Sequence, residues 1–288
     1  MKSVLPILTV VFAIVLIWYA GAVAMNRQWI VDQAARAGNP PPAFGQMVSE
    51  TMALERPVLP APHQVAVELW KGVTGYAVTS KRSLVYHGWI TLSATLLGFA
   101  IGTVAGIALA VGIVHNRAMD LSVMPWAIAS QTIPILAIAP MFIVVMNSMG
   151  VQGLVPKAII SAYLSFFPVV VGMVKGLRSP DAMQLDLLRT YNASGGEVLT
   201  KLRLPSSLPY LFASLKVGAA AALVGAIVGE LPTGAVAGLG ARLLSGSYYG
   251  QTIQIWAALF GAAIVAAALV GVIGLVERVT LRRMGLVR

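Results

Sequence analysis

Long stretches without charge alternate with short charged segments along this chain. No Lys, Arg, Asp or Glu occurs between Lys2 and Arg27, and Val4–Ala24 is continuously apolar. About 17–25 mainly apolar residues are enough for a helix to cross a bilayer. Five further stretches are long enough, namely Ser83–Asn116, Asp120–Lys157, Ala158–Val174, Leu211–Gly229 and Thr252–Val276, and Lys216 is the one charged residue between the ends of any of them. The pattern predicts an all-α integral membrane fold with about six transmembrane helices.

Residues 1–24 are compatible with a cleaved signal peptide or with a retained helix. The apolar run is longer than a usual signal-peptide core and shows no clear small-x-small cleavage pattern, which favours a signal anchor. Residues 25–86 are polar and rich in proline, so we expect an extracytoplasmic connector. Within it, Gln64–Gly72 predicts one short amphipathic helix on the membrane surface or on neighbouring helices. Residues 87–288 form the predicted core transmembrane domain.

Prolines interrupt the third uncharged stretch, at positions 125, 134 and 140. Its helix is therefore expected to be kinked or broken. Broken backbone at membrane depth is tolerated only where it is buried in protein or lines a cavity. Gln131, Thr132 and Pro134 are therefore candidates for a substrate path. Glu230 is a further candidate, because a carboxylate close to an apolar span is costly; alternatively it lies at the interface, since Pro232 soon ends the helix.

Glycines give two further expectations. Gly98, Gly102 and Gly106 recur at every fourth residue, which predicts a smooth stripe that a neighbouring helix approaches closely. The glycine-rich stretch Pro232–Gly250 is expected to be a loop between the last two spans.

Composition excludes several classes of protein. Hydrophobic residues make up 58% of the chain and charged residues 10%, against about 25% charged residues in average soluble proteins. The chain is therefore neither a soluble globular domain nor disordered. Its net charge of +10 comes without a polar basic domain, so no nucleic-acid partner is expected. The chain has no cysteine, and its three histidines are scattered, so no metal site is predicted.

The distribution of Lys and Arg predicts the orientation. With the N terminus in the cytoplasm, the short outside loops hold only Lys157 and Arg242. The inside segments then hold eleven basic residues: Lys2, Arg117, Lys175, Arg178, Arg189, Lys201, Arg203, Arg278, Arg282, Arg283 and Arg288. By the positive-inside rule, both termini and the polar segment 178–210 are expected to be cytoplasmic.

Segment 178–210 is unusually structured for a connection between two spans. Pro180 and Asp181 suit a helix start, and Leu185, Leu188 and Tyr191 then fall on one helical face. Asn192 and the pair Gly195-Gly196 tolerate a left-handed or tight turn. A second helix, Glu197–Leu204, is expected to stop before Pro205. The resulting helix-turn-helix either presents a knob to a partner or packs, solvated, on its own spans.

The same segment resembles the EAA loop of ABC-transporter permeases. The family pattern is Glu-Ala-Ala, three residues, Gly, nine residues and Ile-x-Leu-Pro. Here Asp186-Leu187-Leu188 takes the place of Glu-Ala-Ala, Asn192 that of Gly, and Leu202-Arg203-Leu204-Pro205 ends the pattern. The identities are degenerate while the spacing is intact. Asn is the best substitute for Gly in a left-handed turn.

Other stretches extend the resemblance over roughly residues 57–285. They are Leu59-Pro60-Ala61-Pro62, Thr132-Ile133-Pro134, Ala139-Pro140, Ser165-Phe166-Phe167-Pro168, Gly229-Glu230 and Gly238-Leu239-Gly240. The similarity is strongest to the branch for sulfonates, taurine, nitrate and pyrimidine precursors.

The resemblance implies a type I importer in a bacterial inner membrane. Two permease subunits, identical or paralogous, would form the pore in the lipid bilayer, and an extracytoplasmic binding protein would deliver the substrate. Two cytoplasmic ATPase subunits would bind ATP and Mg²⁺. This chain has no Gly-x4-Gly-Lys-Ser/Thr pattern, so we expect neither ATPase activity nor a bound cofactor in it.

Contact with the ATPase is implied for the EAA-like loop. The residues concerned are Asp186, Leu187, Leu188, Tyr191, Asn192, Ala193, Ser194, Gly195, Leu204 and Pro205. Asp186 would pair with a basic residue of the ATPase. Leu187, Leu188 and Tyr191 would supply apolar anchorage.

The substrate is expected to be a small polar nutrient. The runs Gly229–Gly234 and Gly246–Gly250 look most like those of permeases for pyrimidine-like heterocycles. A sulfonate, taurine or nitrate is the alternative, and such an anion would favour Lys or Arg at depth. A secondary transporter or channel is the more distant alternative; it would use paired ionisable groups and often shows two repeated halves, and neither is evident here.

Overall fold

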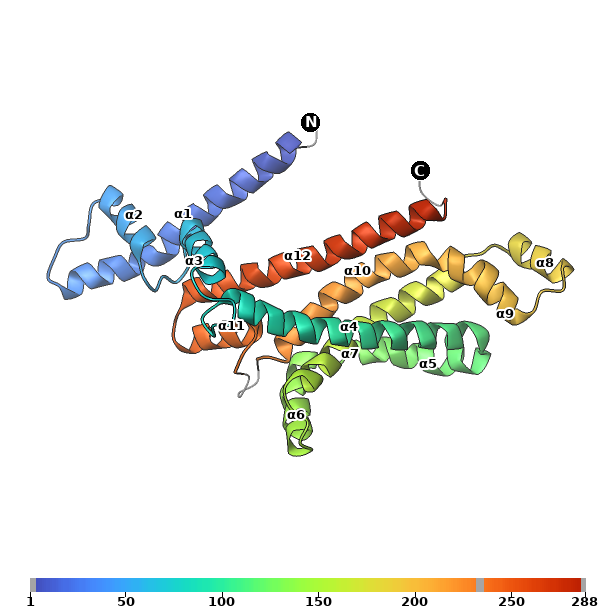
Figure 1. Ribbon diagram of the computed structural model, residues 1–288. Helices are drawn as coiled ribbons and strands as arrows, with labels where there is room; N and C mark the ends of the chain where they lie inside the picture. Colours follow the sequence, from blue (N-terminus) through green and yellow to red (C-terminus); the bar gives the residue numbers. More distant parts are fainter. Residues whose placement is uncertain (1–3, 232–235, 286–288) are drawn as a thin grey trace. The chain divides into compact units, whose positions relative to one another are not determined.

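The computed structural model describes residues 4–231 and 236–285. Within these ranges the chain is helical and contains no strand (Figure 1), as the hydrophobic pattern predicts. It folds as two compact units. The first unit holds Met1–His87 with Ala241–Gly261, and the second holds Gly88–Gly240 with Ala262–Arg288.

The helices account for the predicted number of spans. In chain order the elements are α1 (Val4–Arg36), α2 (Phe44–Ala53), α3 (Pro62–Thr74), α4 (Leu84–His115), α5 (Arg117–Ser130), α6 (Ile135–Ser148), α7 (Leu154–Leu177), α8 (Ala182–Thr190), α9 (Gly195–Val198), the π-helical turn η1 (Leu199–Arg203), α10 (Leu204–Val228), α11 (Leu239–Tyr248) and α12 (Thr252–Arg283). Among the described residues, five helices are long and apolar enough to cross a membrane, and the bent pair α5–α6 counts as a sixth span. The prediction of about six spans is confirmed.

The third span is broken at one of its three prolines. Helices α5 and α6 meet at an angle of 96°. Pro134 is the N-cap of α6, whereas Pro125 and Pro140 lie inside helices. A proline disfavours helical backbone at the preceding residue, so the chain leaves the helix before Pro134. The predicted break is confirmed and lies at residues 131–134.

Helix α7 packs closely against α4 in the second unit. A Cβ atom placed on Gly98 would lie 2.4 Å from the carbonyl oxygen of Ala158 and 2.3 Å from the Cβ atom of Ser161. Similar crowding would follow at Gly102 and Gly106. The glycine stripe is therefore a backbone-to-backbone contact, as its spacing predicts.

Helix α7 also lies along α10 (Figure 1). Gly172 and Gly176 of α7 face Ser214 and Ser207 of α10, with no room for a Cβ atom at either glycine. A buried apolar cluster fills the space around this helix pair; its members are Ala110, Ile113, Val169, Val170, Met173, Val174 and Leu177. Helix α7 is thus held by small-residue contacts with both α4 and α10.

A buried asparagine organises the first unit. Asn26 of α1 donates to the carbonyl oxygen of Leu59 at 2.8 Å and accepts from the amide of Val58 at 2.7 Å. Trp18 donates to the carbonyl oxygen of Pro60 at 3.0 Å, two residues before α3 begins. These bonds fix the proline-rich entry of α3 on α1, so the predicted amphipathic helix is confirmed, with α3 longer than Gln64–Gly72 at both ends.

Three other expectations are wrong in detail. Helix α1 continues past Ala24 to Arg36, because polar residues in water do not end a helix and Gln28 bonds Asp32 one turn later. The connector contains a second helix, α2, whose buried Met47 and Thr51 pack within the unit. The stretch expected to be a loop contains α11, and residues 232–235 of that stretch lie outside the described ranges.

The close contact between α4 and α7 gives a first prediction. Gly98→Ala pushes a methyl group into the α7 backbone, and overpacking of this kind lowers stability by about 1–3 kcal/mol. Gly88→Ala, on the same helix, meets nothing within 4 Å. Thermal unfolding of the purified variants in detergent should show a lower Tm for Gly98→Ala alone; equal Tm values would contradict the packing.

Candidate functional site

Segment 178–210 starts with a capped helix, as predicted. Asp181 is the N-cap of α8, and its carboxylate accepts from the amide of Gln184 at 2.8 Å. Helix α8 ends at Thr190. Asn192 then takes φ +53°, the one positive φ outside glycine among the described residues. The left-handed turn predicted at Asn192 is confirmed.

A capping box starts the second helix. The Ser194 hydroxyl accepts from the amide of Glu197, and the Glu197 carboxylate accepts from the amide of Ser194 at 2.9 Å. Gly195 and Gly196 form the first turn of α9 and have no positive φ. Their expected role in a tight turn is therefore wrong, because Asn192 alone supplies the left-handed residue.

The expected stop before Pro205 is also wrong. The helix runs without interruption from Gly195 to Val228. A proline removes an amide donor and clashes with the carbonyl four residues earlier, which here belongs to Lys201. That carbonyl lies within the π-helical turn Leu199–Arg203, whose wider winding accommodates Pro205 in the first turn of α10.

Helix α8 presents an apolar stripe. Met183, Leu187 and Tyr191 follow one another at intervals of four residues and are 82%, 56% and 76% exposed. Leu188 is only half-buried and lies off this stripe, together with Leu185. Of the predicted anchors, Leu187 and Tyr191 are thus free for a partner, and Met183 joins them although sequence reasoning missed it.

The predicted acidic contact is also exposed. Asp186 accepts from Arg189 at 2.9 Å, and both side chains are more than half exposed. Such a surface pair contributes little to stability. The carboxylate is therefore accessible to another basic group.

Three contacts fasten the segment to the transmembrane helices. Arg178, just after α7, pairs with Asp120 of α5 at 2.8 Å. Arg203 donates to the carbonyl oxygen of Leu177 at 3.0 Å, which joins the end of η1 to the end of α7. Leu204 packs against the buried cluster of the second unit. These contacts attach the two ends of segment 178–210 to the spans that it connects.

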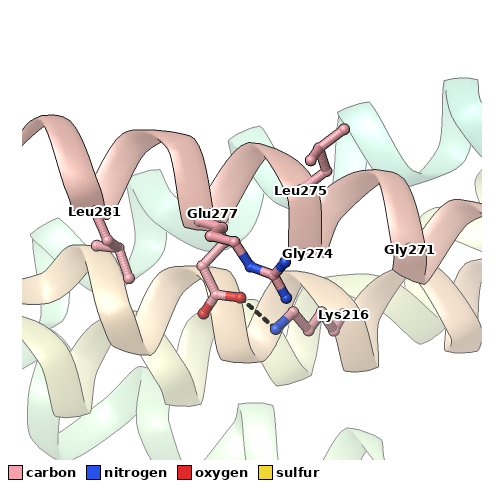
Figure 2. Close-up of a pocket in the computed structure, with 7 residues that line it drawn as sticks. Lys216, Gly271, Gly274, Leu275, Glu277 and Leu281 are labelled. Atoms are coloured by element: carbon pink, nitrogen blue, oxygen red, sulfur yellow. Dashed lines mark hydrogen bonds and ion pairs between the residues drawn. The ribbon is translucent and has the colours of Figure 1, made fainter. Parts of the chain in front are cut away.

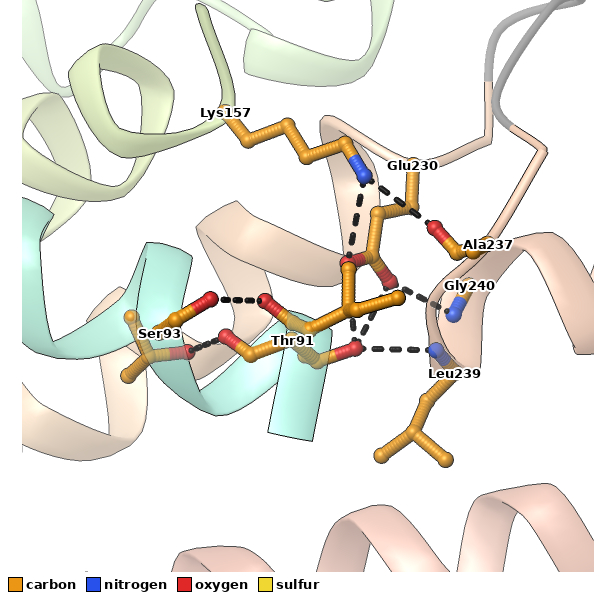
Figure 3. A network of polar contacts seen from close by, with 9 residues as sticks. Thr91, Ser93, Lys157, Glu230, Ala237, Leu239 and Gly240 are labelled. Atoms are coloured by element: carbon orange, nitrogen blue, oxygen red, sulfur yellow. Dashed lines mark hydrogen bonds and ion pairs between the residues drawn. The ribbon is translucent and has the colours of Figure 1, made fainter. Parts of the chain in front are cut away.

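A second polar site surrounds Glu230 at the other end of α7 and α10 (Figure 3). Its side chain is fully buried, and both carboxylate oxygens accept from the Thr91 hydroxyl of α4, at 3.0 and 2.9 Å. The amide of Gly240 donates to the same carboxylate at 2.9 Å. Lys157 of α7 lies 3.6 Å away and also donates to the carbonyl oxygen of Ala237.

The chain after α10 is shaped to fit this carboxylate. Thr91 accepts from the amide of Leu239 at 2.8 Å. Gly238 takes φ +129°, and a Cβ atom there would lie 2.1 Å from the carboxylate carbon of Glu230. Glu230 therefore holds the start of α11 against α4 and α7, and its oxygens are occupied by protein groups.

The other candidates for the substrate path belong to the broken third span. Gln131, Thr132 and Pro134 are exposed at the break between α5 and α6. Thr132 donates to the carbonyl oxygen of Ala129 at 2.7 Å. Among the described residues, no hydrogen bond joins Gln131 or Thr132 to Glu230. Ile135, next to Pro134, packs against the cluster Ala139, Ile160 and Val228. A shared substrate path for the four candidates stays a prediction.

An ion pair between α10 and α12 was missed from sequence. Lys216 donates to Glu277, and the two side chains are 34% and 22% exposed (Figure 2). Lys216 lies inside α10. Lys216 and Glu277 carry opposite charges in two separate apolar helices, and this pattern could have predicted the pair.

Comparison with known protein families matches residues 102–285 to the binding-protein-dependent transport system inner membrane components. The chain belongs to this family. The matched range contains both the EAA-like segment and Glu230. The resemblance to ABC-transporter permeases is thereby confirmed, and the chain is a multi-pass permease component of the inner membrane.

Three relatives of this permease carry names that specify a solute. The riboflavin transport system permease protein RibX of Chloroflexus aurantiacus is 31% identical over 78% of this chain and 80% of its own. The formylaminopyrimidine transport permease protein ThiX of Halalkalibacterium halodurans is 30% identical over 67% and 72%. The putative aliphatic sulfonates transport permease protein SsuC of Bacillus subtilis is 26% identical over 83% and 83%.

The buried network of the permease gives a second prediction. Lys157→Met leaves the Glu230 carboxylate without its cation, which lowers stability by about 3–5 kcal/mol. Adding Glu230→Gln removes the unpaired charge, so the double variant should regain part of the loss. Thermal unfolding in detergent measures both effects.

The matched control is Lys71→Met, which removes an exposed cation on α3. It should melt like the unmodified permease. Strictly additive losses for Lys157 and Glu230 would contradict a coupled pair.

Proposed function

We propose that this permease drives uptake of a small heterocyclic nutrient by taking mechanical force from two cytoplasmic ATPase subunits. The proposal rests on the exposed stripe Met183, Leu187 and Tyr191. The stripe lies on the helix-turn-helix of segment 178–210 (the knob), whose ends are fastened to α5, α7 and α10. Apolar side chains on a surface outside the membrane indicate a protein contact.

The stripe is the apolar part of the docking surface. It inserts into a groove of the ATPase, while Asp186 exchanges Arg189 for a basic residue of the partner. The left-handed turn at Asn192 sets the direction in which α8 projects relative to α9. Each part of the knob therefore has a separate task in docking.

The conformational step is a rigid-body movement. The ATPase pair binds ATP and Mg²⁺ and closes, and each docked knob moves with it. Arg203 and Leu204 pass this movement to the end of α7 and the start of α10. Two permease subunits, identical or paralogous, form the path, and a binding protein delivers the solute on the extracytoplasmic side.

The solute class rests on two observations. The names RibX and ThiX both refer to heterocyclic compounds. The two lysines nearest to the interior of the second unit, Lys157 and Lys216, are each paired with a glutamate, which leaves them little attraction for an anion. A sulfonate is the second candidate, favoured by the name SsuC.

Calorimetry on the cognate binding protein distinguishes the two classes of solute. Tight binding of a pyrimidine or flavin, with none of taurine or an alkanesulfonate, supports the heterocycle. The reverse result replaces it with the sulfonate and leaves the coupling mechanism untouched.

Asn192 provides a specific test of coupling. Proline fixes φ near −65°, which is incompatible with the φ of +53° at Asn192. Asn192→Pro should therefore abolish ATP-driven uptake while membrane insertion stays normal. Asn192→Gly keeps the turn and should transport normally. Uptake into proteoliposomes that contain the full transporter measures both; normal uptake by the proline variant would refute the role of the turn.

The docking stripe can be tested by crosslinking, because the chain contains no cysteine. Leu187→Cys should form a crosslink with the ATPase subunit when a short bifunctional thiol-amine reagent is added. Val104→Cys, which is similarly exposed but lies on α4, is the matched control and should form none. Equal crosslinking at both positions, or none at Leu187→Cys, would rule out docking through α8.

A further inference from the structure

A cavity of about 490 Å³ lies between α10 and α12 (Figure 2), and its lining includes no residue of segment 178–210 and not Glu230. Its lining combines polar and apolar groups from the end of α12 with one residue of α10. The lining residues are Lys216, Gly271, Gly274, Leu275, Glu277, Arg278 and Leu281.

Two glycines keep this cavity open. A Cβ atom on Gly271 would meet nothing within 4 Å, and one on Gly274 would meet only Cε of Lys216, at 3.7 Å. The glycines therefore do not bring α12 closer to α10, in contrast to Gly98 and its neighbours. They leave open space along α12 at these two positions.

The charged groups in the cavity carry an excess of positive charge. Lys216 is paired with Glu277. Arg278 is exposed and, among the described residues, has no hydrogen-bond or ion-pair partner. Arg282 follows one helical turn later, also exposed. After the pair is counted as neutral, an arginine remains to attract an anion at the rim.

The rim lies at the depth of lipid head groups. The uncharged stretch Thr252–Val276 is about 38 Å long as a helix, at about 1.5 Å per residue. The hydrocarbon core of a bilayer is about 30 Å thick. Glu277 and Arg278 follow this stretch directly, so they lie near the interface, while the neighbouring Leu275 is 62% exposed on the apolar side.

We propose that this cavity binds an anionic phospholipid. The phosphate group accepts hydrogen bonds from Arg278, and an acyl chain lies in the open space over Gly271 and Gly274. Basic pockets between transmembrane helices at head-group depth are suited to such lipids. A lipid held there occupies the space between α10, which continues the knob, and α12.

Lipid retention by the purified permease tests this proposal without any ATPase. The permease is reconstituted into nanodiscs of phosphatidylcholine with a small fraction of phosphatidylglycerol, extracted in mild detergent and analysed by native mass spectrometry. We expect phosphatidylglycerol to be enriched on the unmodified chain. Arg278→Gln should reduce this enrichment at least fivefold, whereas Arg117→Gln, an exposed arginine at the start of α5, should leave it unchanged.

Glu277→Gln separates lipid binding from a purely structural ion pair. It frees Lys216 and adds positive charge, so retention of phosphatidylglycerol should stay equal or increase. Inorganic phosphate at millimolar concentration should not displace the lipid. The proposal is overturned if Arg278→Gln retains as much phosphatidylglycerol as Arg117→Gln, if Glu277→Gln loses it, or if free phosphate displaces it.

Discussion

Backbone-to-backbone contact of α7 with both α4 and α10 is the constraint on which the second unit depends. Lipid tails are as apolar as leucine side chains, so helices in a bilayer gain little by burying large apolar residues against each other. Glycines such as Gly98 and Gly172 instead allow close packing against serines of the neighbouring helices. The two ends of α7 and α10 then carry the two polar sites, the knob at one end and Glu230 at the other. A shift of either site therefore moves the same pair of helices.

Much of this fold could be predicted from the sequence, because the bilayer imposes length and charge rules. The uncharged runs locate the spans, and Pro134 locates the break. Helices α2 and α11 could not be predicted in this way, since both are short and mixed in composition. They form because of tertiary contacts, such as those of Met47 and of the Thr91 hydroxyl.

In the candidate sites, too, local features could be predicted from the sequence and features that depend on tertiary contacts could not. Asn192 was predictable because its turn is local, and Asp181 because its cap is local. Three other features could not be predicted in this way. The bond between Thr91 and Glu230 and the pair Lys216–Glu277 join residues more than 60 positions apart. The orientation of Leu187 away from Leu188 depends on the exact rotation of α8, which residue spacing alone does not give. The π-helical turn before Pro205 could not be predicted either, because it lets the helix continue through a proline that would end an ordinary α-helix.

The central claim of the proposal is that this permease receives its energy from ATPase subunits through segment 178–210. Uptake of the solute into proteoliposomes that contain the permease and its binding protein, with and without the ATPase subunits and with ATP inside, tests it most directly. The account predicts accumulation against a gradient only when the ATPase and ATP are both present. Accumulation at an undiminished rate without the ATPase would contradict it.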